Sequence, residues 1–284
     1  MQVGHQPHHH LSFSRHVNTL PPPPPPSLSR EGVWIAIPTY NEERTIHAVA
    51  QKALALCPNV LVADDGSTDH TLAELEGLPV TLVRNPVNQG KAAALRNAFE
   101  HALRAGACCV VTLDGDGQHD PEDVRQLLWA WQGHPDCVVI GSRLHDRTQI
   151  PPARYHANRF ARFWISWAAG HPIADSQSGF RVYPAPVMAL VLAGRVRGRR
   201  FTFESEVLIE AAEHGHQTLA VAISGCYPGD ARASYFRPVV DIAKIVAMVA
   251  VRLLKKGLHP LGLWRSLRPF QVLAPPEDFE PGGS

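Results

Sequence analysis

The stretch "CCVVTLDGDGQHDP", residues 108–121, changes from an apolar run to a cluster of acidic residues. Its apolar half, residues 108–113, is typical of a buried strand. Asp120 precedes a proline, and an aspartate followed by proline at the first helical position predicts a helix start. Asp114 and Asp116 have no such local role. They are therefore the first candidate functional residues of the chain.

The spacing of Asp114 and Asp116 predicts a metal site. The two residues stand two positions apart just after a strand, so both carboxylates can reach one hard cation, Mg²⁺ or Mn²⁺. The neighbouring glycines permit the tight backbone that this requires. A calcium-binding EF-hand loop does not fit, because His119 and Arg125 stand where that loop needs glycine and glutamate.

Apolar runs like residues 108–113 recur along the chain and alternate with helical patterns. Strands are predicted at 33–37, 60–64, 80–83, 108–113 and 137–141, and helices near 42–56, 69–76, 90–105 and 121–132. This alternation predicts an α/β fold with a Rossmann-like, mostly parallel sheet and helices on both faces. Ligands of such sheets bind beyond the carboxyl ends of the strands.

Polar segments follow the predicted strands at that edge. They are "PTYNE" (38–42), "DDGSTDHT" (64–71), "DGDGQHDP" (114–121) and "GSR" (141–143). Asn41 and Asp69 are also candidate helix caps. The segments predict a nucleotide site, yet "NPVNQGKAAA" (85–94) lacks the first glycine and the Ser or Thr of a P-loop. No dinucleotide GxGxxG motif follows a strand.

The composition excludes some classes of protein. A net charge of +1 argues against a dedicated nucleic-acid binder. The cysteines show no CxxC spacing, so we expect reduced, buried thiols in a cytoplasmic protein. We find neither a signal-peptide core nor an apolar stretch of roughly 18 residues. The cysteines are Cys57, Cys108, Cys109, Cys137 and Cys226.

The chain divides into four predicted parts. Residues 1–31 form a disordered His- and Pro-rich arm, 32–237 the main domain, 238–270 an amphipathic helical segment and 271–284 a flexible tail. In "VVDIAKIVAMVAVRLLKK" (239–256) the charged residues share one arc and leave a wide apolar face. That face suits either a membrane interface, with Lys and Arg toward anionic headgroups, or packing on the domain or a second subunit.

The ordered set "IPTYNE", "ADDGSTDHT", "NQGKAAALRNAF", "LDGDGQHDP", "GSR" and "DSQSGFRVY" resembles the family 2 glycosyltransferases with a GT-A fold. Within these it looks most like the dolichyl- and polyprenyl-phosphate sugar transferases. The resemblance implies inverting, metal-dependent transfer of a hexose from a GDP- or UDP-sugar to a polyprenyl-phosphate lipid. Such an enzyme would act in the cytoplasm, peripherally at the inner membrane face.

Two other activities remain open at this point. One is transfer to a hydroxyl of a lipid or natural product. The other, from a different class, is a sugar-1-phosphate nucleotidyltransferase, which shares the α/β layout and an acidic metal site. That class should carry a Gly-rich loop after the first strand, where this chain has "PTYNE".

The resemblance also assigns site residues. Those similar to the metal site are Asp114, Asp116 and Gln118. Those similar to the nucleotide-sugar site are Pro38, Tyr40, Glu42, Asp65, Gly90, Lys91 and Asp114. Those similar to the catalytic and phosphate-binding groups are Asp175, Arg143 and Arg181.

Asp175 is the candidate general base if the acceptor is a hydroxyl, whereas a lipid phosphate, already ionised, needs none. Glu204 and Glu206 lie in a helical pattern, so one can point to the site and the other away. A solvated helix face is the alternative for either glutamate.

Overall fold

The computed structural model describes residues 32–142, 152–198, 201–223, 238–270 and 272–275. The predicted arm (1–31), most of the predicted tail, Arg143 and Cys226 lie outside these residues.

Among the described residues, eight strands form one sheet in the order β3-β2-β1-β4-β6-β5-β7-β8. The strands are β1 (Val33–Thr39), β2 (Val60–Asp64), β3 (Thr81–Arg84), β4 (Cys109–Thr112), β5 (Val138–Ser142), β6 (Arg181–Pro184), β7 (Thr218–Ala222) and β8 (Val272–Leu273). The strands pair in parallel, except that β6 runs antiparallel between β4 and β5. The predicted mostly parallel sheet is confirmed.

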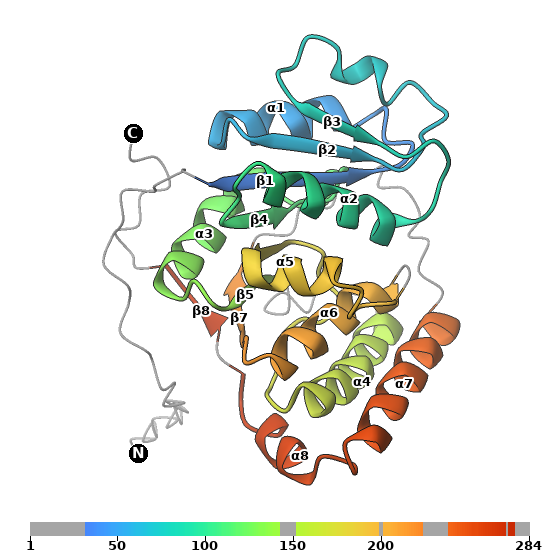
Figure 1. Cartoon of the computed structure of the whole chain (residues 1–284), viewed down its shortest axis with the longest axis vertical. Helices are drawn as coiled ribbons and strands as arrows, with labels where there is room; N and C mark the ends of the chain where they lie inside the picture. The colour runs from blue at the N-terminus through green and yellow to red at the C-terminus, as the bar shows by residue number, and fades with distance from the viewer. Residues whose placement is uncertain (1–31, 143–151, 199–200, 224–237, 271, 276–284) are drawn as a thin grey trace, which may run out of the picture.

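Helices cover both faces of the sheet (Figure 1). They are α1 (Ile46–Leu56), α2 (Lys91–Arg104), α3 (Val124–Gly133), α4 (Pro152–Ala169), α5 (Ala185–Leu192), α6 (Phe201–Glu213), α7 (Pro238–Lys255) and α8 (Pro260–Ser266). Alternate residues of β1 divide between the faces, with Ile35 and Ile37 packing toward α1 and α3 and Ala36 toward α2. This alternation is what a strand buried on both sides requires.

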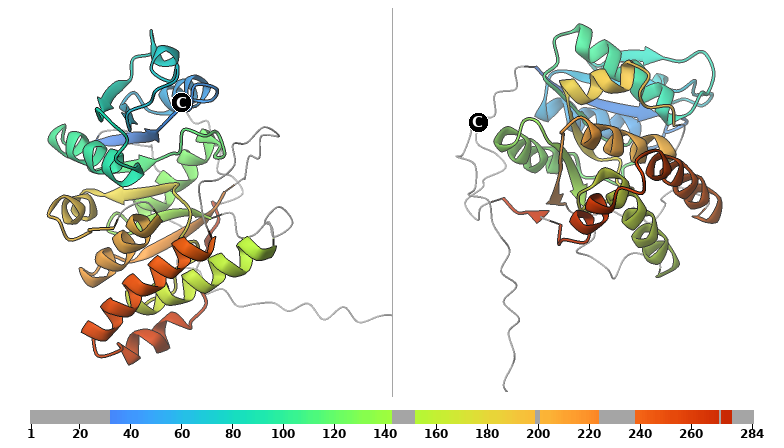
Figure 2. Two further views of the ribbon diagram at one scale, coloured as in Figure 1. Left: turned by 90° about the vertical axis from the view of Figure 1, so that its right-hand side faces the viewer. Right: turned by 60° about the horizontal axis from the view of Figure 1, so that its bottom comes forward.

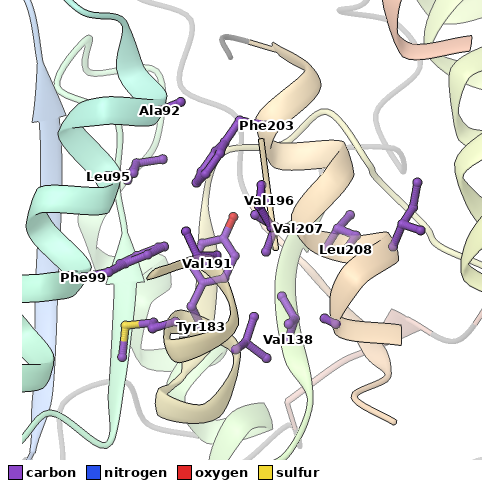
Figure 3. Close-up of a cluster of buried hydrophobic side chains, with 14 of the residues drawn as sticks. Ala92, Leu95, Phe99, Val138, Tyr183, Val191, Val196, Phe203, Val207 and Leu208 are labelled. Atoms are coloured by element: carbon purple, nitrogen blue, oxygen red, sulfur yellow. The ribbon is translucent and has the colours of Figure 1, made fainter. Parts of the chain in front are cut away.

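One buried cluster packs α2 and α6 together with β6. Leu95 and Phe99 of α2 pack with Tyr183 of β6 and with Phe203 and Val207 of α6 (Figure 3). The rings of Phe99 and Tyr183 lie 5.2 Å apart between centroids. This packing fixes α2 and α6 on the same face of the sheet.

Helix α7 packs alongside α4 and α6 (Figure 2). Its residues Ile245, Val249 and Leu253 are buried in the same core as α2 and α6. The packing alternative for residues 239–256 is therefore confirmed for this face. Within the described part of the chain, every helix is too short or too polar to span a bilayer.

Several local predictions are wrong. The helix predicted at 69–76 is only the 3-10 helix η1 (Ala73–Leu75). Asn41 and Asp69 cap no helix. Their side chains instead accept hydrogen bonds from backbone N–H groups of the two loops after β1 and β2: Asn41 from Thr68, and Asp69 from Glu43 and Thr71. Residues 272–273, predicted to be flexible, extend the sheet as β8.

The prediction of buried thiols is only partly correct. The four described cysteines are thiols. Cys57 and Cys109 are buried and Cys137 is half-buried, but Cys108 is exposed. Cys108 precedes the first residue of β4, so its side chain lies outside the sheet core.

Candidate active site

The carboxyl ends of the first strands meet at one edge of the sheet. Thr39 of β1 pairs in register with Asp64 of β2, which pairs with Arg84 of β3. On the other side of β1, Leu113 after β4 donates its N–H to Ala36. Asp114 therefore emerges at the same edge as the segments that follow β1 and β2.

The segments after β1 and β2 are joined by hydrogen bonds. The Asn41 and Glu42 N–H groups donate to the Ser67 and Thr71 hydroxyls at 2.9 and 2.8 Å. Of the residues predicted to meet the nucleotide here, Pro38 is buried at the end of β1, and Tyr40 and Glu42 are half-buried in the following loop. Their nucleotide contacts stay predictions.

Asp65 supports the loop that leads into α2. Its carboxylate accepts hydrogen bonds from the Asn85 amide at 2.7 Å and from the Gln89 and Gly90 N–H groups at 3.0 and 2.6 Å. Asp65 is 2 % exposed. It thus lies behind the loop, which presents Gly90 and Lys91, and its contact with the nucleotide sugar stays a prediction.

Lys91 is the first residue of α2 and forms the centre of the site. Its Nζ lies 2.7 Å from Asp114 Oδ1 and 2.8 Å from Glu204 Oε1. Burial alone would lower the pKa of Lys91, but the carboxylates of Asp114 and Glu204 outweigh it and raise that pKa above its ordinary value. The ammonium group is therefore charged at neutral pH.

Gly179 provides the space for this contact. A Cβ atom at this position would lie 2.6 Å from Lys91 Nζ, 3.0 Å from Asp114 Oδ2 and 3.1 Å from Glu204 Oε1. The Thr112 hydroxyl donates to the Gly179 carbonyl at 2.6 Å and fixes the approach of this loop to β4. Neither Glu204 nor Gly179 was among the residues assigned from the motifs.

The other acidic residues of the stretch have separate environments. Asp116 Oδ1 accepts the Gln118 N–H at 3.0 Å, which closes a tight turn. Asp120 accepts the Glu122 N–H at 3.2 Å and caps the 3-10 helix η2 (Pro121–Asp123), so its predicted capping role is confirmed. Gln118 is half-buried beside them.

The donor set fits a hard cation that shares its ligands with a phosphate. Asp114 and Asp116 offer carboxylate oxygens, and Mg²⁺ in such sites takes one or two carboxylates, phosphate oxygens and waters. The described residues contain no group of three or more His, Cys, Asp or Glu side chains arranged to hold a metal. The site therefore fits a metal held together with a ligand better than a metal held by protein alone.

Arg181 does not lie where the sequence predicted. It is fully buried, and its guanidinium donates to the carbonyls of Ser176, Ser178 and Glu204 and to the Tyr183 hydroxyl. A phosphate contact does not fit this environment. Arg181 instead holds the loop 175–179 against α6.

Asp175 begins that loop and borders a pocket. Its Oδ1 accepts the N–H groups of Gln177 and Ser178, both at 3.2 Å. The pocket is lined by residues 174–177 and by Asn158, Arg159 and Arg162 of α4. Arg162 donates to the Ala174 carbonyl at 3.3 Å, whereas Arg159 is exposed. Two cationic side chains thus lie beside the candidate base.

Glu204 and Glu206 point in opposite directions, as one of the sequence alternatives predicted. Glu204 reaches Lys91, whereas Glu206 pairs with Arg252 of α7 at 2.9 Å. Both are buried, so the solvated-face alternative is wrong. Their spacing of two within a helix was the signal for this division.

Comparison with known proteins identifies the class. The model of the glycosyl transferase family 2 matches residues 34–185, more than half of the 284-residue chain. The chain belongs to this family and is a glycosyltransferase. This overturns the nucleotidyltransferase alternative.

Two relatives with named activities are each a little under 30% identical to this chain. The chain is 29% identical over 201 residues to polyprenol monophosphomannose synthase of Mycolicibacterium smegmatis, covering 67% of this chain and 76% of the relative. It is 28% identical over 203 residues to the UDP-N-acetylglucosamine–dolichyl-phosphate N-acetylglucosaminyltransferase of Methanococcus voltae, with 64% and 80% covered. The predicted resemblance to lipid-phosphate sugar transferases is confirmed.

Solved structures show the same fold. Glucosyl-3-phosphoglycerate synthase of Mycobacterium tuberculosis in complex with UDP has a TM-score of 0.57 at 20% identity, covering 79% of each chain. The same synthase with Mn²⁺ and UDP-glucose gives 0.52 at 19% identity, covering 79% of this chain and 78% of that one. The predicted GT-A fold is confirmed.

Proposed function

We propose that this glycosyltransferase transfers a hexose from a UDP- or GDP-sugar to a polyprenyl phosphate, with inversion at the anomeric carbon. The observation that carries the proposal is the placement of Asp114, Asp116 and Lys91 at one sheet edge. The pocket lined by Asp175, Arg159 and Arg162 would be a second, cationic site for the acceptor. Relatives that act on dolichyl and polyprenol phosphates support this acceptor class.

The donor would lie across the carboxyl ends of β1, β2 and β4. Asp114 and Asp116, with Gln118 beside them, would hold Mg²⁺ or Mn²⁺ against the diphosphate. The metal would stabilise the negative charge that develops on the departing nucleoside diphosphate. Lys91 and the N-terminal end of α2 supply further positive charge at that place. The Mn²⁺ bound by the solved glucosyl-3-phosphoglycerate synthase supports a divalent metal here.

The acceptor phosphate would bind near Arg159 and Arg162. A phosphate oxygen attacks the anomeric carbon while the bond to the diphosphate breaks, and no proton has to be removed. Guanidinium groups suit this role because they bind phosphate with paired donors. Transfer to a hydroxyl stays the second candidate, because Asp175 lies beside the same pocket and could accept the proton.

A panel of nucleotide sugars with Mn²⁺ tests the donor site. We expect a UDP- or GDP-hexose to raise the melting temperature of the wild type. Asp114→Asn should lose most of that shift, because the carboxylate that would hold the metal is gone. A panel in which no nucleotide sugar shifts the melting temperature would contradict the proposal.

We further propose a peripheral membrane contact through the end of α7 and α8. The apolar side chains Val251, Leu254, Leu258, Leu261, Trp264 and Leu267 are more than half exposed there. Lys255, Arg265 and Arg268 are also exposed in this segment. An exposed apolar patch flanked by cations is typical of a surface that binds anionic lipid.

This proposal assigns the lipid contact to fewer basic residues of 239–256 than the sequence predicted. Arg252 and Lys256 do not point to headgroups, because they pair with Glu206, Glu210 and Glu213 of α6. Co-sedimentation with phosphatidylglycerol vesicles tests the remaining surface. Leu254→Ser/Trp264→Ser should reduce binding by roughly tenfold or more, whereas Leu192→Ser, an exposed leucine of α5, should not. Equal binding of all three proteins would contradict the contact.

A further inference from the structure

The cation of Lys91 lies at the place where a metal would approach Asp114. Its Nζ is 2.7 Å from Asp114 Oδ1 and 2.8 Å from Glu204 Oε1. Both carboxylates are largely buried, with 25% and 10% of their side-chain surface exposed, whereas that of Lys91 is 34% exposed. The lysine therefore offsets one of the two negative charges of this acid pair and still borders solvent.

We propose that Lys91 is a built-in counter-ion that makes metal binding depend on the nucleotide. Before a nucleotide binds, the ammonium neutralises Asp114. When metal and diphosphate arrive together, it moves to the diphosphate, and Asp114 is released to the metal. The inference rests on the proposed function, since it requires a nucleotide donor and a divalent metal at this edge.

Electrostatics favours this order of binding. A divalent cation on Asp114 would lie close to a positive charge that is tethered there, and repulsion at such distances is strong where water is partly excluded. The N-terminal end of α2 adds positive potential of the same sign. A diphosphate reverses the balance because its oxygens attract the metal, the ammonium and the helix end at once.

The chain gives the lysine room to move. Lys91 is joined to the backbone by a flexible stem, its side chain is 34% exposed, and Gly179 places no side chain against its ammonium. Glu204 of α6 shares the ammonium with Asp114 and so competes with Asp114 for it. Loss of the Glu204 charge should therefore leave Lys91 more firmly on Asp114 and weaken metal binding, which is the opposite of the effect of losing Lys91.

The test is a titration with Mn²⁺, followed by the electron paramagnetic resonance signal of the free ion, with and without UDP or GDP. Lys91→Met should bind Mn²⁺ alone about tenfold more tightly than the wild type, within the roughly 5- to 150-fold range of coupling between sites. The strengthening of Mn²⁺ binding by nucleotide should fall by the same factor. Glu204→Gln should weaken binding of Mn²⁺ alone.

Two variants separate charge from folding. Lys91→Arg keeps the charge and should bind Mn²⁺ like the wild type, and Lys52→Met, which removes an exposed lysine of α1, should do the same. Circular dichroism and the melting temperature confirm that each variant is folded. Equal affinity of Lys91→Met and wild type for Mn²⁺ alone would overturn the counter-ion role while leaving the proposed function standing. Failure of the wild type to bind UDP, GDP or their sugars would overturn both.

Discussion

The donor half of the site and the helical C-terminal part are held together in different ways. At the carboxyl ends of β1, β2 and β4, side chains such as Asp65 and Asp69 accept hydrogen bonds from loop backbone. In the helical part, α7 is fixed by apolar packing and by Arg252, and its far end exposes apolar residues. The first region is pre-organised for a small polar ligand, and the second exposes the apolar side chains through which we propose a membrane contact.

The largest effect is expected in the first region. Asp116→Ala should lower the turnover number by roughly 100- to 1,000-fold, because charge stabilisation of the leaving group is lost. The measurement is sugar transfer at saturating donor and Mn²⁺. Asp120→Ala, in the same acidic stretch, is the matched control and should keep activity because Asp120 is a helix cap. Equal losses in both variants would remove the distinction between metal ligand and cap.

Arg181→Met tests whether Arg181 has a structural role, because this residue holds the loop 175–179, beside the donor half of the site, against α6 of the helical part. The change leaves three carbonyls and one hydroxyl without their donor in the interior, so unfolding should become easier by about 3 kcal/mol or more. Urea unfolding measures this free energy. Arg104→Met, at an exposed i,i+4 pair, should change it by less than about 0.5 kcal/mol. A stable Arg181→Met variant with impaired phosphate binding would restore the role predicted from sequence.

Arg252→Gln should weaken the attachment of α7 to α6. The change removes the cation that Glu206, Glu210 and Glu213 share. We expect the free energy of unfolding to fall by about 2 kcal/mol, which is less than for fully buried ion pairs because the cluster borders solvent. Unfolding in urea at neutral pH measures the loss. Unchanged stability would show that apolar packing alone holds α7.

The same cluster predicts a pH dependence. Burial would raise the pKa of Glu213, but Lys256 and Arg252 outweigh it and lower that pKa below its ordinary value of 4.5. The stabilisation of the fold by the ionised Glu213 is therefore complete above pH 4.5, and it is lost as the pH falls through the lowered pKa of Glu213. The difference in unfolding free energy between wild type and Arg252→Gln should shrink in that acid range. A constant difference would contradict the ionic origin.

The smallest effect is that of the cap at Asp120. Asp120→Ala should reduce the free energy of unfolding by about 1 kcal/mol, because the Glu122 N–H loses its acceptor. Asp120→Asn should restore most of it, since the amide oxygen can accept the same bond. Identical stability of the three proteins would contradict the capping role.

The sequence predicted the fold and the edge that carries the site because both follow from local patterns. Apolar runs define β1, β2 and β4, and the polar residues at their ends define the edge. The antiparallel β6 was not predicted, since strand direction depends on how distant segments pair. Local sequence patterns also could not show that the Asn41 side chain accepts a hydrogen bond from the Thr68 N–H instead of capping a helix.

The roles of single charged residues were harder to predict. The family resemblance assigned Arg181 to the phosphate-binding groups, yet its buried guanidinium donates to carbonyl groups. Lys91 and Glu204 are far apart in the chain, and only the packing of α2 and α6 on one face brings them together. The spacing of residues in the sequence predicts which face of a helix a side chain occupies, but it does not predict which residue of another helix that side chain meets.

Transfer of labelled hexose from a UDP- or GDP-sugar into the organic phase tests the central claim most directly, with Mn²⁺ and either a polyprenyl phosphate or the matching polyprenol. We predict label in the lipid with the phosphate acceptor only, and almost none with Asp116→Ala. Label with the polyprenol only would establish the hydroxyl alternative. No transfer to either acceptor from any donor that binds, or full transfer by Asp116→Ala, would contradict the account.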